Sequence, residues 1–331
     1  MTGELVDVAD LARRLVASDT PGTLTTLFSA RGSTYRPLGS MMVSLPGRRA
    51  GGISGGCLEE YVARIGERAT RSTPAVMLRF DTHPDADETI PVLGCGGSIE
   101  LLVERLTPNH VAFLTAFAAA AGRDTDSWVA CVARRDGESV SVTRDWLPPA
   151  DHETRSIHKV VASDTDVLVQ YVPALTRLVI FGAGDDARPL CDIGASLGWH
   201  VSVADRRTRL ATAARFPRAR TIVAAEWDEA IDALTFSTRT AVVLMTHSVD
   251  DDACILARLA RQPLAYLGAL GPAHRREWLV EQASAAAHTL RGPIGLDLGD
   301  RSPAGIAVAV AAEILARLNC RHARPLHDPL S

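Results

Sequence analysis

Two of the six cysteines in this chain of 331 residues lie inside glycine clusters, in residues 51–57 (GGISGGC) and 94–97 (GCGG). Glycine adopts positive φ and lets backbone N–H groups approach a ligand without Cβ atoms in the way. Successive amides that turn inward form an anion-binding nest. A cysteine at the edge of such a nest lies in partial positive charge, which favours the thiolate. The clusters therefore predict a pocket for a phosphate-bearing ligand with sulfur chemistry beside it, formed by Gly55, Gly56, Cys57, Cys95, Gly96 and Gly97.

Arg36 is a further candidate ligand for the phosphate. It lies in the glycine-bounded segment 32–39 (GSTYRPLG), between two predicted strands. A guanidinium group matches the geometry of a phosphate and stays charged at neutral pH. The alternative is a loop arginine without a role.

The remaining cysteines do not form a recognisable site. Cys131, Cys191 and Cys254 lie in apolar strand or helix patterns, which predicts buried, unreactive thiols. The segment 320–327 holds Cys320 and two histidines, but their spacing matches no familiar metal site. No C-x-x-C pair occurs that would suggest a zinc or dithiol site. We expect a cytoplasmic protein, and a reducing cytoplasm would keep these cysteines as thiols.

A second motif, in residues 182–187 (GAGDDA), follows an apolar strand and opens a helix. This is the pattern of a dinucleotide-binding turn, in which Gly182 makes the tight turn and Gly184 allows close approach of a pyrophosphate. Asp205 follows about twenty residues later, where a ribose-binding acid is expected. Asp185 and Asp186 would repel phosphates, so a domain that keeps the fold without the nucleotide remains an alternative.

His247 follows the predicted strand 241–245, at the edge where open α/β sheets bind ligands. With one of the aspartates 250–252 as its partner, it is a candidate general acid or base. The alternative is that Thr246 and Ser248 cap the next helix and His247 only lines the loop. Arg275 and Arg276 follow the next strand, where they either hold an anion or are solvated.

The periodicity of apolar residues gives these motifs their framework. In the first half it predicts helices over 5–15, 58–72 and 111–121, strands over 23–30, 41–45, 76–80, 99–104 and 167–172, a hairpin over 128–133 and 139–143, and a loop over 147–165. In the second half, strands 178–181, 201–203, 241–245 and 264–267 alternate with helices. Such alternation is typical of a parallel sheet with helices on both faces. We therefore predict a mixed α/β N-terminal domain over 1–173 and a Rossmann-like, doubly wound domain over 174–331.

Charge and hydropathy limit the partners. The net charge is −4 and both signs are interspersed, which gives no reason to expect nucleic acid. The apolar runs are too short to cross a bilayer, and the start lacks a basic segment followed by an apolar core. We expect neither a membrane span nor a secretory signal.

The motifs taken in order resemble the XdhC/CoxI family of accessory proteins for molybdenum hydroxylases such as xanthine dehydrogenase and carbon monoxide dehydrogenase. Segments 32–39, 52–59 and 95–97 are similar to its G-S-x-x-R-x-x-G, S-G-G-C-x-E and C-G-G motifs. In the second half the resemblance covers 182–184 (GAG), 205–207 (DRR), 246–247 (TH), 266–268 (YLG) and 293–297 (PIGLD).

The resemblance implies binding of the molybdenum cofactor, a pterin with a dithiolene and a phosphate, and help in its sulfuration and insertion. It implies a molybdenum hydroxylase client and a cysteine desulfurase as partners, with a homodimer left open. Cys57 and Cys95 become candidate molybdenum contacts, because thiolates are soft ligands. The rival hypothesis is an NAD(P)-dependent oxidoreductase that uses Gly182, Gly184 and Asp205, with His247 as its acid or base.

Overall fold

The computed structural model describes residues 2–32, 34–81, 97–137, 139–149, 152, 154–282 and 289–325. The chain divides into two compact units, Met1–Ala174 and Leu175–Ser331. Each unit has its own sheets and its own hydrophobic core.

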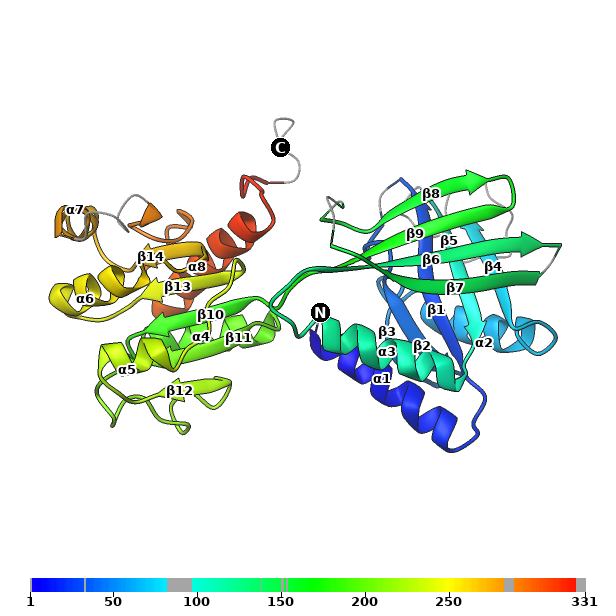
Figure 1. The fold of residues 1–331 in the computed structure, drawn as a ribbon, viewed down its shortest axis with the longest axis horizontal. Helices are drawn as coiled ribbons and strands as arrows, with labels where there is room; N and C mark the ends of the chain where they lie inside the picture. Colours follow the sequence, from blue (N-terminus) through cyan, green and yellow to red (C-terminus); the bar gives the residue numbers. More distant parts are fainter. Residues whose placement is uncertain are drawn as a thin grey trace. The chain divides into compact units, whose positions relative to one another are not determined.

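The N-terminal unit contains two antiparallel sheets (Figure 1). The first has the order β3-β2-β1-β5-β4 and consists of β3 (Arg48–Gly51), β2 (Met41–Leu45), β1 (Thr23–Arg31), β5 (Ser98–Arg105) and β4 (Ala75–Asp81). The second has the order β7-β6-β9-β8 and consists of β7 (Ser139–Leu147), β6 (Ser127–Asp136), β9 (Thr165–Val172) and β8 (Ile157–Ala162).

The first sheet is covered on both faces because its strands alternate two sets of apolar side chains. One face packs under α2 (Glu59–Ala69), where Leu58 and Val62 contact Leu101 and neighbouring residues. The other face packs on the second sheet through a cluster that contains Phe28, Leu102 and Leu168. The helices α1 (Thr2–Ala17) and α3 (Pro108–Ala120) contribute apolar side chains to a third hydrophobic cluster.

The C-terminal unit is a parallel sheet in the order β12-β11-β10-β13-β14. Its strands are β10 (Arg177–Phe181), β11 (His200–Ala204), β12 (Thr221–Val223), β13 (Thr240–Leu244) and β14 (Leu264–Ala269). The helices α4 (Ala187–Ser196) and α8 (Pro303–Leu318) contribute to the core on one face. The helices α5 (Trp227–Asp232), α6 (Val249–Leu259) and α7 (Ala273–Gln282) contribute to the core on the other. The predicted fold class is confirmed.

Most predicted elements are present within a few residues, including the hairpin of β6 and β7. The predicted loop over 147–165 is wrong in its centre, because β8 forms there and pairs with β9. Three short elements, β3, β12 and α5, have no counterpart in the prediction. The strands β3, β8 and β12 bury none of their residues and α5 is only six residues long, so the periodicity that identifies strands and helices is weak in all four.

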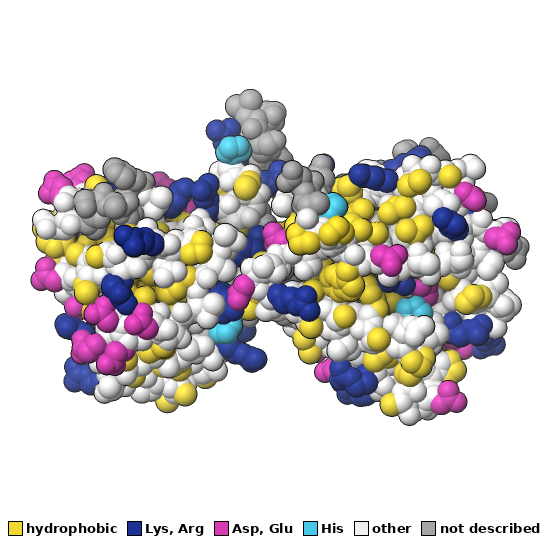
Figure 2. Space-filling model, in the orientation of Figure 1, with side chains coloured by type: hydrophobic (Ala, Val, Ile, Leu, Met, Phe, Trp, Pro, Cys, Tyr) yellow, Lys and Arg dark blue, Asp and Glu magenta, His cyan; other side chains and the backbone are white. Residues whose placement is uncertain are grey.

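Among the described helices, none is both long and apolar enough to cross a membrane. On the visible face of the N-terminal unit, hydrophobic side chains gather over the sheet of β6–β9 (Figure 2). Trp146, Val160 and Val161 are exposed on this sheet.

Candidate functional site

The first glycine cluster forms the loop between β3 and α2. Gly51 has φ +76°, and a Cβ there would collide with the carbonyl oxygen of Met41 on the paired strand β2. Gly56 has φ +110°, and a Cβ there would project into open space. Gly51 is therefore required for the close approach of two strands, whereas Gly56 lets the loop turn and leaves its outer side open.

Glu59, at the start of α2, turns back into this loop. Its side chain is 1% exposed. One carboxylate oxygen, Oε1, accepts hydrogen bonds from the backbone N–H of Ile53 at 3.2 Å and of Ser54 at 2.9 Å. The other, Oε2, accepts from the Ser54 hydroxyl at 2.6 Å and lies 3.5 Å from the Arg49 guanidinium. The carboxylate thus acts as an internal anion for the loop.

The environment lowers the pKa of Glu59. Burial raises the pKa, but the hydrogen bonds from the Ser54 hydroxyl and from nearby backbone N–H groups outweigh that effect by stabilising the charged form. The group is therefore a fixed negative charge at neutral pH.

Several amides of this loop are therefore used inside the protein, and phosphate binding by Gly55, Gly56 and Cys57 stays a prediction. The amides of Ile53 and Ser54 are used by Glu59, and those of Gly56 and Leu58 donate to the Ser54 hydroxyl oxygen at 3.3 Å. From the sequence, Glu59 is an acid in the first turn of the predicted helix 58–72, where a negative charge suits the helix dipole. The signal that this expectation missed is an acid in the first turn of a helix directly after a glycine loop, within reach of the loop amides.

Cys57 lies on the outer side of the loop, next to Leu58, the N-cap residue of α2. The residue is exposed, and its thiol lies 3.5 Å from the Ser54 hydroxyl oxygen. The predicted helix over 58–72 places Cys57 at or just before a helix N-terminus, and this position is confirmed. Gly55 and Gly56 are exposed beside it, so the thiol and two residues of glycine backbone face solvent together.

The segment that carries Arg36 packs against this loop. The Tyr35 side chain, 78% exposed, lies over Gly55, and a Cβ on Gly55 would be 3.4 Å from its ring. A Cβ on Gly52 would be 3.3 Å from the Arg36 guanidinium. Arg36 also donates to Glu4 of α1 at 3.1 Å, and its buried Nε has no hydrogen-bond partner among the described residues. Arg36 therefore lies beside the first cluster as expected, although part of its charge is already paired.

Of the second cluster, Cys95 and Gly96 lie outside the described residues, and Gly97 is described. A Cβ on Gly97 would collide with the Arg31 carbonyl oxygen at the end of β1. A role of Cys95 and Gly96 at the same site as Cys57 stays a prediction.

In the C-terminal unit, Gly182 and Gly184 occupy the turn from β10 to α4. Gly182 has φ +111°, and a Cβ there would collide with the Met245 carbonyl oxygen, so this glycine serves strand packing. A Cβ on Gly184 would meet only the His247 ring, at 3.4 Å. A cavity of about 230 Å³ lies there at the carboxyl ends of β10, β13 and β14, between Gly184, His247 and Gly271.

Asp205 does not point into that cavity. It is 1% exposed, and its Oδ2 accepts from the Ala183 amide at 2.7 Å, inside the glycine turn. Arg207 donates to the same carboxylate through its backbone amide and its guanidinium. Burial raises the pKa of Asp205, but these bonds outweigh it and the pKa is lowered. The acid clamps the turn to the end of β11, an arrangement that does not favour its predicted bond to a ribose.

Two of the three acids that follow His247 have other partners, and Asp250 is exposed. Asp252 is fully buried, accepts from the Thr246 hydroxyl at 2.5 Å and pairs with Arg275 at 2.7 Å. Asp251 pairs with Arg206 at 3.2 Å. Among the residues that the structure describes, the exposed His247 ring has no hydrogen-bond or ion-pair partner. Among the described contacts, His247 therefore lacks its predicted carboxylate partner. Arg275 is paired with Asp252, so its charge is not available to an external anion.

The other described thiols differ in their exposure. Cys131 and Cys191 are buried as predicted, whereas Cys254 is exposed, so its predicted burial is wrong. It lies on the solvent side of α6, whose buried residues include Ile255 and Leu256. Within the described ranges, no group of three or more His, Cys, Asp or Glu side chains is arranged to hold a metal ion.

The chain combines two units. The first has antiparallel sheets and exposes a cysteine on a glycine loop, and the second is of the Rossmann type. This combination defines a two-domain class of protein. The family profile described as "XdhC Rossmann domain" matches residues 178–314, and that described as "XdhC and CoxI family" matches residues 15–81. The chain belongs to the XdhC and CoxI family, which confirms the resemblance.

Relatives span both units. The chain is similar to a probable xanthine dehydrogenase subunit of Bacillus subtilis (strain 168), with 28% identity over 91% of this chain and 94% of the relative. It is similar to the "Molybdenum cofactor insertion chaperone PaoD" of Escherichia coli (strain K12), with 25% identity over 88% of this chain and 81% of the relative. A crystal structure of a xanthine dehydrogenase from Bacillus halodurans matches with a TM-score of 0.78 and 23% identity, over 98% of this chain and 99% of that chain. At that identity the likeness concerns the fold alone.

Proposed function

We propose that this chain is an accessory protein that binds the molybdenum cofactor and delivers it to a molybdenum hydroxylase. Membership of the XdhC and CoxI family supports the accessory role. The relative named as a molybdenum cofactor insertion chaperone supports the choice of cargo. The observation that carries the proposal is the exposed Cys57 thiol on a loop that Glu59 already holds in place.

The chemistry of this loop fits the cargo. A thiolate is a soft donor, suited to a metal that already has sulfur ligands. Gly56 leaves the backbone beside Cys57 bare, and the side chain next to Gly55 is the Tyr35 ring, so a flat ring system can approach the sulfur alongside that ring. Tyr35 offers an exposed aromatic face over Gly55. We therefore assign Cys57 to the metal end of the cofactor and Tyr35 to its ring.

The sulfuration role is a finer part of the proposal. A cysteine desulfurase would supply the sulfur as a persulfide, and this chain would hold the cofactor while the sulfur is added. The C-terminal crevice offers less support for a nicotinamide-dependent oxidoreductase, because the Asp205 carboxylate is saturated by Ala183 and Arg207. We do not propose that activity.

The test uses the full chain and purified molybdenum cofactor. After incubation and gel filtration, molybdenum is measured by mass spectrometry and pterin by the fluorescence of its oxidised form. Wild-type protein should retain both, and Cys57→Ala should retain roughly tenfold less, since a metal–thiolate contact is lost.

Cys254→Ala is the matched control, because this thiol is also exposed but lies on α6. It should retain cofactor like the wild type. Negligible retention by wild-type protein would refute the proposed cargo, whereas equal retention by Cys57→Ala would refute only the assignment of Cys57.

A further inference from the structure

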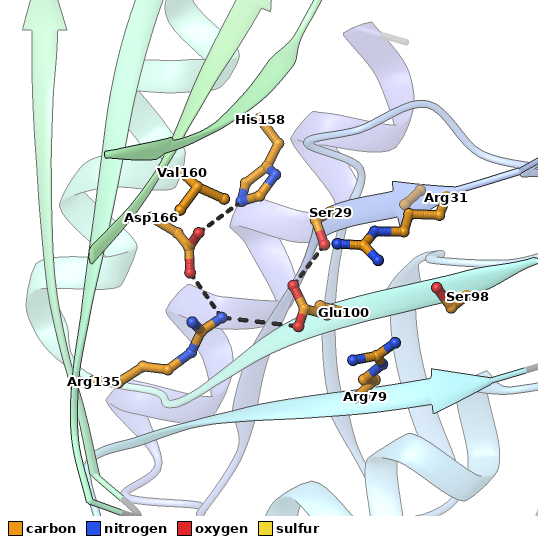
Figure 3. A pocket seen from close by; sticks show the side chains of 10 residues that line it. Ser29, Arg31, Arg79, Ser98, Glu100, Arg135, His158, Val160 and Asp166 are labelled. Atoms are coloured by element: carbon orange, nitrogen blue, oxygen red, sulfur yellow. Dashed lines mark hydrogen bonds and ion pairs between the residues drawn. The ribbon is translucent and has the colours of Figure 1, made fainter. Parts of the chain in front are cut away.

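The N-terminal unit contains a second polar site, between its two sheets (Figure 3). It is a cavity of about 230 Å³ lined from both sides. β1, β4 and β5 of the first sheet and β6, β8 and β9 of the second sheet contribute charged side chains, namely Arg31, Arg79, Glu100, Arg135, His158 and Asp166. Sequence reasoning did not find this site, because its residues come from six strands and form no motif.

The two acids are neutralised inside the cluster and orient two of the bases. Asp166, whose side chain is 3% exposed, pairs through Oδ2 with Arg135 at 2.7 Å and through Oδ1 with the His158 ring at 3.2 Å. Glu100 accepts from the Ser29 hydroxyl at 2.7 Å and lies 3.8 Å from the Arg135 guanidinium. Figure 3 shows these contacts as one continuous chain. Arg135 and His158 are thus held in fixed positions before any ligand binds.

Arg31 and Arg79 are the surplus cations. They lie on the strands that flank β5, where Arg31 is opposite Ser98 and Arg79 is opposite Glu100. Figure 3 shows their guanidinium groups on either side of β5. Neither has a hydrogen-bond or ion-pair partner among the described residues. Both are exposed, so within the described part of the chain their guanidinium groups are available to an external anion.

Charge and size together define the ligand. Among the described residues that line the cavity, three guanidinium groups outnumber two carboxylates. The charge of these residues is therefore positive even without His158, whereas the net charge of the whole chain is −4. A phosphate monoester carries about −1.5 to −2 charges and three strong acceptor oxygens, which suit forked guanidinium donors. Pockets for whole drug-sized ligands span about 300–1,000 Å³. The cavity is therefore sized for a phosphate group and its nearest atoms, the end of a larger ligand.

We propose that this cavity binds the phosphate end of the pterin cofactor, an inference that rests on the proposed function. The chain connects the two sites directly. β1 ends at Arg31 in the cavity and leads into the segment that places Tyr35 over Gly55 and Arg36 beside Gly52. β3 runs in the same direction as β1, so the cavity and the Cys57 loop lie toward the same end of the first sheet. They lie on its opposite faces, so a ligand that reaches both would pass around that end. One ligand would have its metal at the loop and its phosphate between the sheets.

The first experiment measures phosphate recognition alone. Phenyl phosphate and inorganic phosphate are titrated by calorimetry into full-length wild-type protein, into Arg31→Gln/Arg79→Gln and into the control Arg64→Gln/Arg68→Gln. The control removes the same charge from exposed positions of α2. Wild type and control should bind phenyl phosphate alike, and the cavity variant should bind it at least about tenfold more weakly. Equal binding by all three proteins would overturn the inference.

The second experiment identifies the source of the phosphate. The fluorescent oxidised pterin is titrated with its phosphate intact and after phosphatase treatment. Wild-type protein should prefer the phosphorylated form, and Arg31→Gln/Arg79→Gln should bind both forms equally. If wild type does not distinguish them while it retains intact cofactor by gel filtration, the cavity assignment fails and the proposed function stands. If it binds phenyl phosphate but retains no cofactor, both fail and the cavity serves another phosphate monoester.

Discussion

Glu59 links three polar groups of one loop and the Arg49 guanidinium of β3 through a single carboxylate. Its contacts with Ile53, Ser54 and Arg49 all depend on negative charge, since the donors are N–H, O–H and guanidinium groups. A carboxylate that accepts several such bonds stabilises the fold more than a neutral acceptor of the same shape.

We predict that Glu59→Gln lowers the free energy of unfolding by about 1–3 kcal/mol at pH 7, because the amide retains the shape but not the charge. Since the folded pKa lies below the ordinary value of 4.5, this stabilisation is present above pH 4.5 and is lost as the pH falls below it. Urea unfolding from pH 7 to pH 3 measures it. The difference between variant and wild type should shrink on acidification.

Glu60→Gln is the control, because this neighbour is exposed and belongs to the same helix turn. It should change the unfolding free energy by less than about 0.5 kcal/mol. A Glu59→Gln variant as stable as this control would show that the loop does not depend on the carboxylate.

Glu104 is a second buried acid, at the end of β5. It is 3% exposed and bonded to Arg144 through both oxygens and to the His110 ring at 3.2 Å. Burial raises its pKa, but Arg144 and His110 outweigh burial and lower the pKa to about 2. The pair is therefore ionised under most conditions, with Arg144 stacked 4.9 Å from the centre of the Phe113 ring.

We predict that Glu104→Gln destabilises the N-terminal unit by about 3–5 kcal/mol at pH 7, because Arg144 is left with a buried, unpaired charge. The wild-type pair stabilises the fold fully above pH 4.5 and loses that contribution as the pH falls from 4.5 to about 2. Denaturant unfolding across this range measures the loss. Glu67→Gln, which breaks the exposed pair with Arg71, is the control and should hardly change the free energy of unfolding at any pH in this range.

At the level of elements, β8 is an edge strand with a break in its pairing. The register shifts between Val160 and Ala162, so the pairing is irregular at Val161. Val160 and Val161 are 70% and 66% exposed. Exposed apolar side chains on an unpaired strand edge promote association between chains, and an irregularity in the edge opposes it.

We predict that Val161→Lys reduces aggregation at high protein concentration and leaves the unfolding midpoint nearly unchanged, because the side chain contacts little. Light scattering during concentration and thermal unfolding test the two parts. A marked drop in the midpoint would mean that the residue is covered in the protein in solution. Leu168→Lys, a fully buried position on neighbouring β9, should by contrast abolish folding of the sheet.

How far sequence predicts these elements depends on how much apolar surface each one buries. β10 and β13 are buried along most of their length, and their predicted bounds agree with the structure within one residue, as do those of β2. β8 buries none of its side chains, so its sequence resembles a loop. The two candidate sites also differ in how far the sequence predicts them. Cys57 and its glycines form a local motif, whereas the pairing of Arg135 with Asp166 needs the register of β6 and β9, which no local pattern encodes.

At the scale of the whole molecule, each described hydrophobic cluster contains residues of one unit only. Two clusters consist only of residues from Leu178 onward, and the other three only of residues up to Val172. No described core residue is shared between clusters of different units. Each unit therefore has the internal contacts of an independently folding domain.

We predict that the fragment 175–331 folds on its own. Its circular dichroism and thermal midpoint should match the corresponding transition of the full chain, which should unfold in two steps. Limited proteolysis of the full chain should cut near residues 173–176 and yield both units. A fragment without a cooperative transition would show that the C-terminal unit depends on contacts outside its own clusters.

The loop that Glu59 organises also has a kinetic consequence. Because its backbone is ordered by internal hydrogen bonds, the entropy of ordering it is lost once, during folding, and not at each encounter with a ligand. Binding and release of the proposed cofactor would then require no rearrangement of the chain here. The residence time is set by the direct contacts alone, and these can be replaced one at a time by an acceptor. A preordered loop of this kind would suit the proposed role, because it allows fast binding together with release to an acceptor.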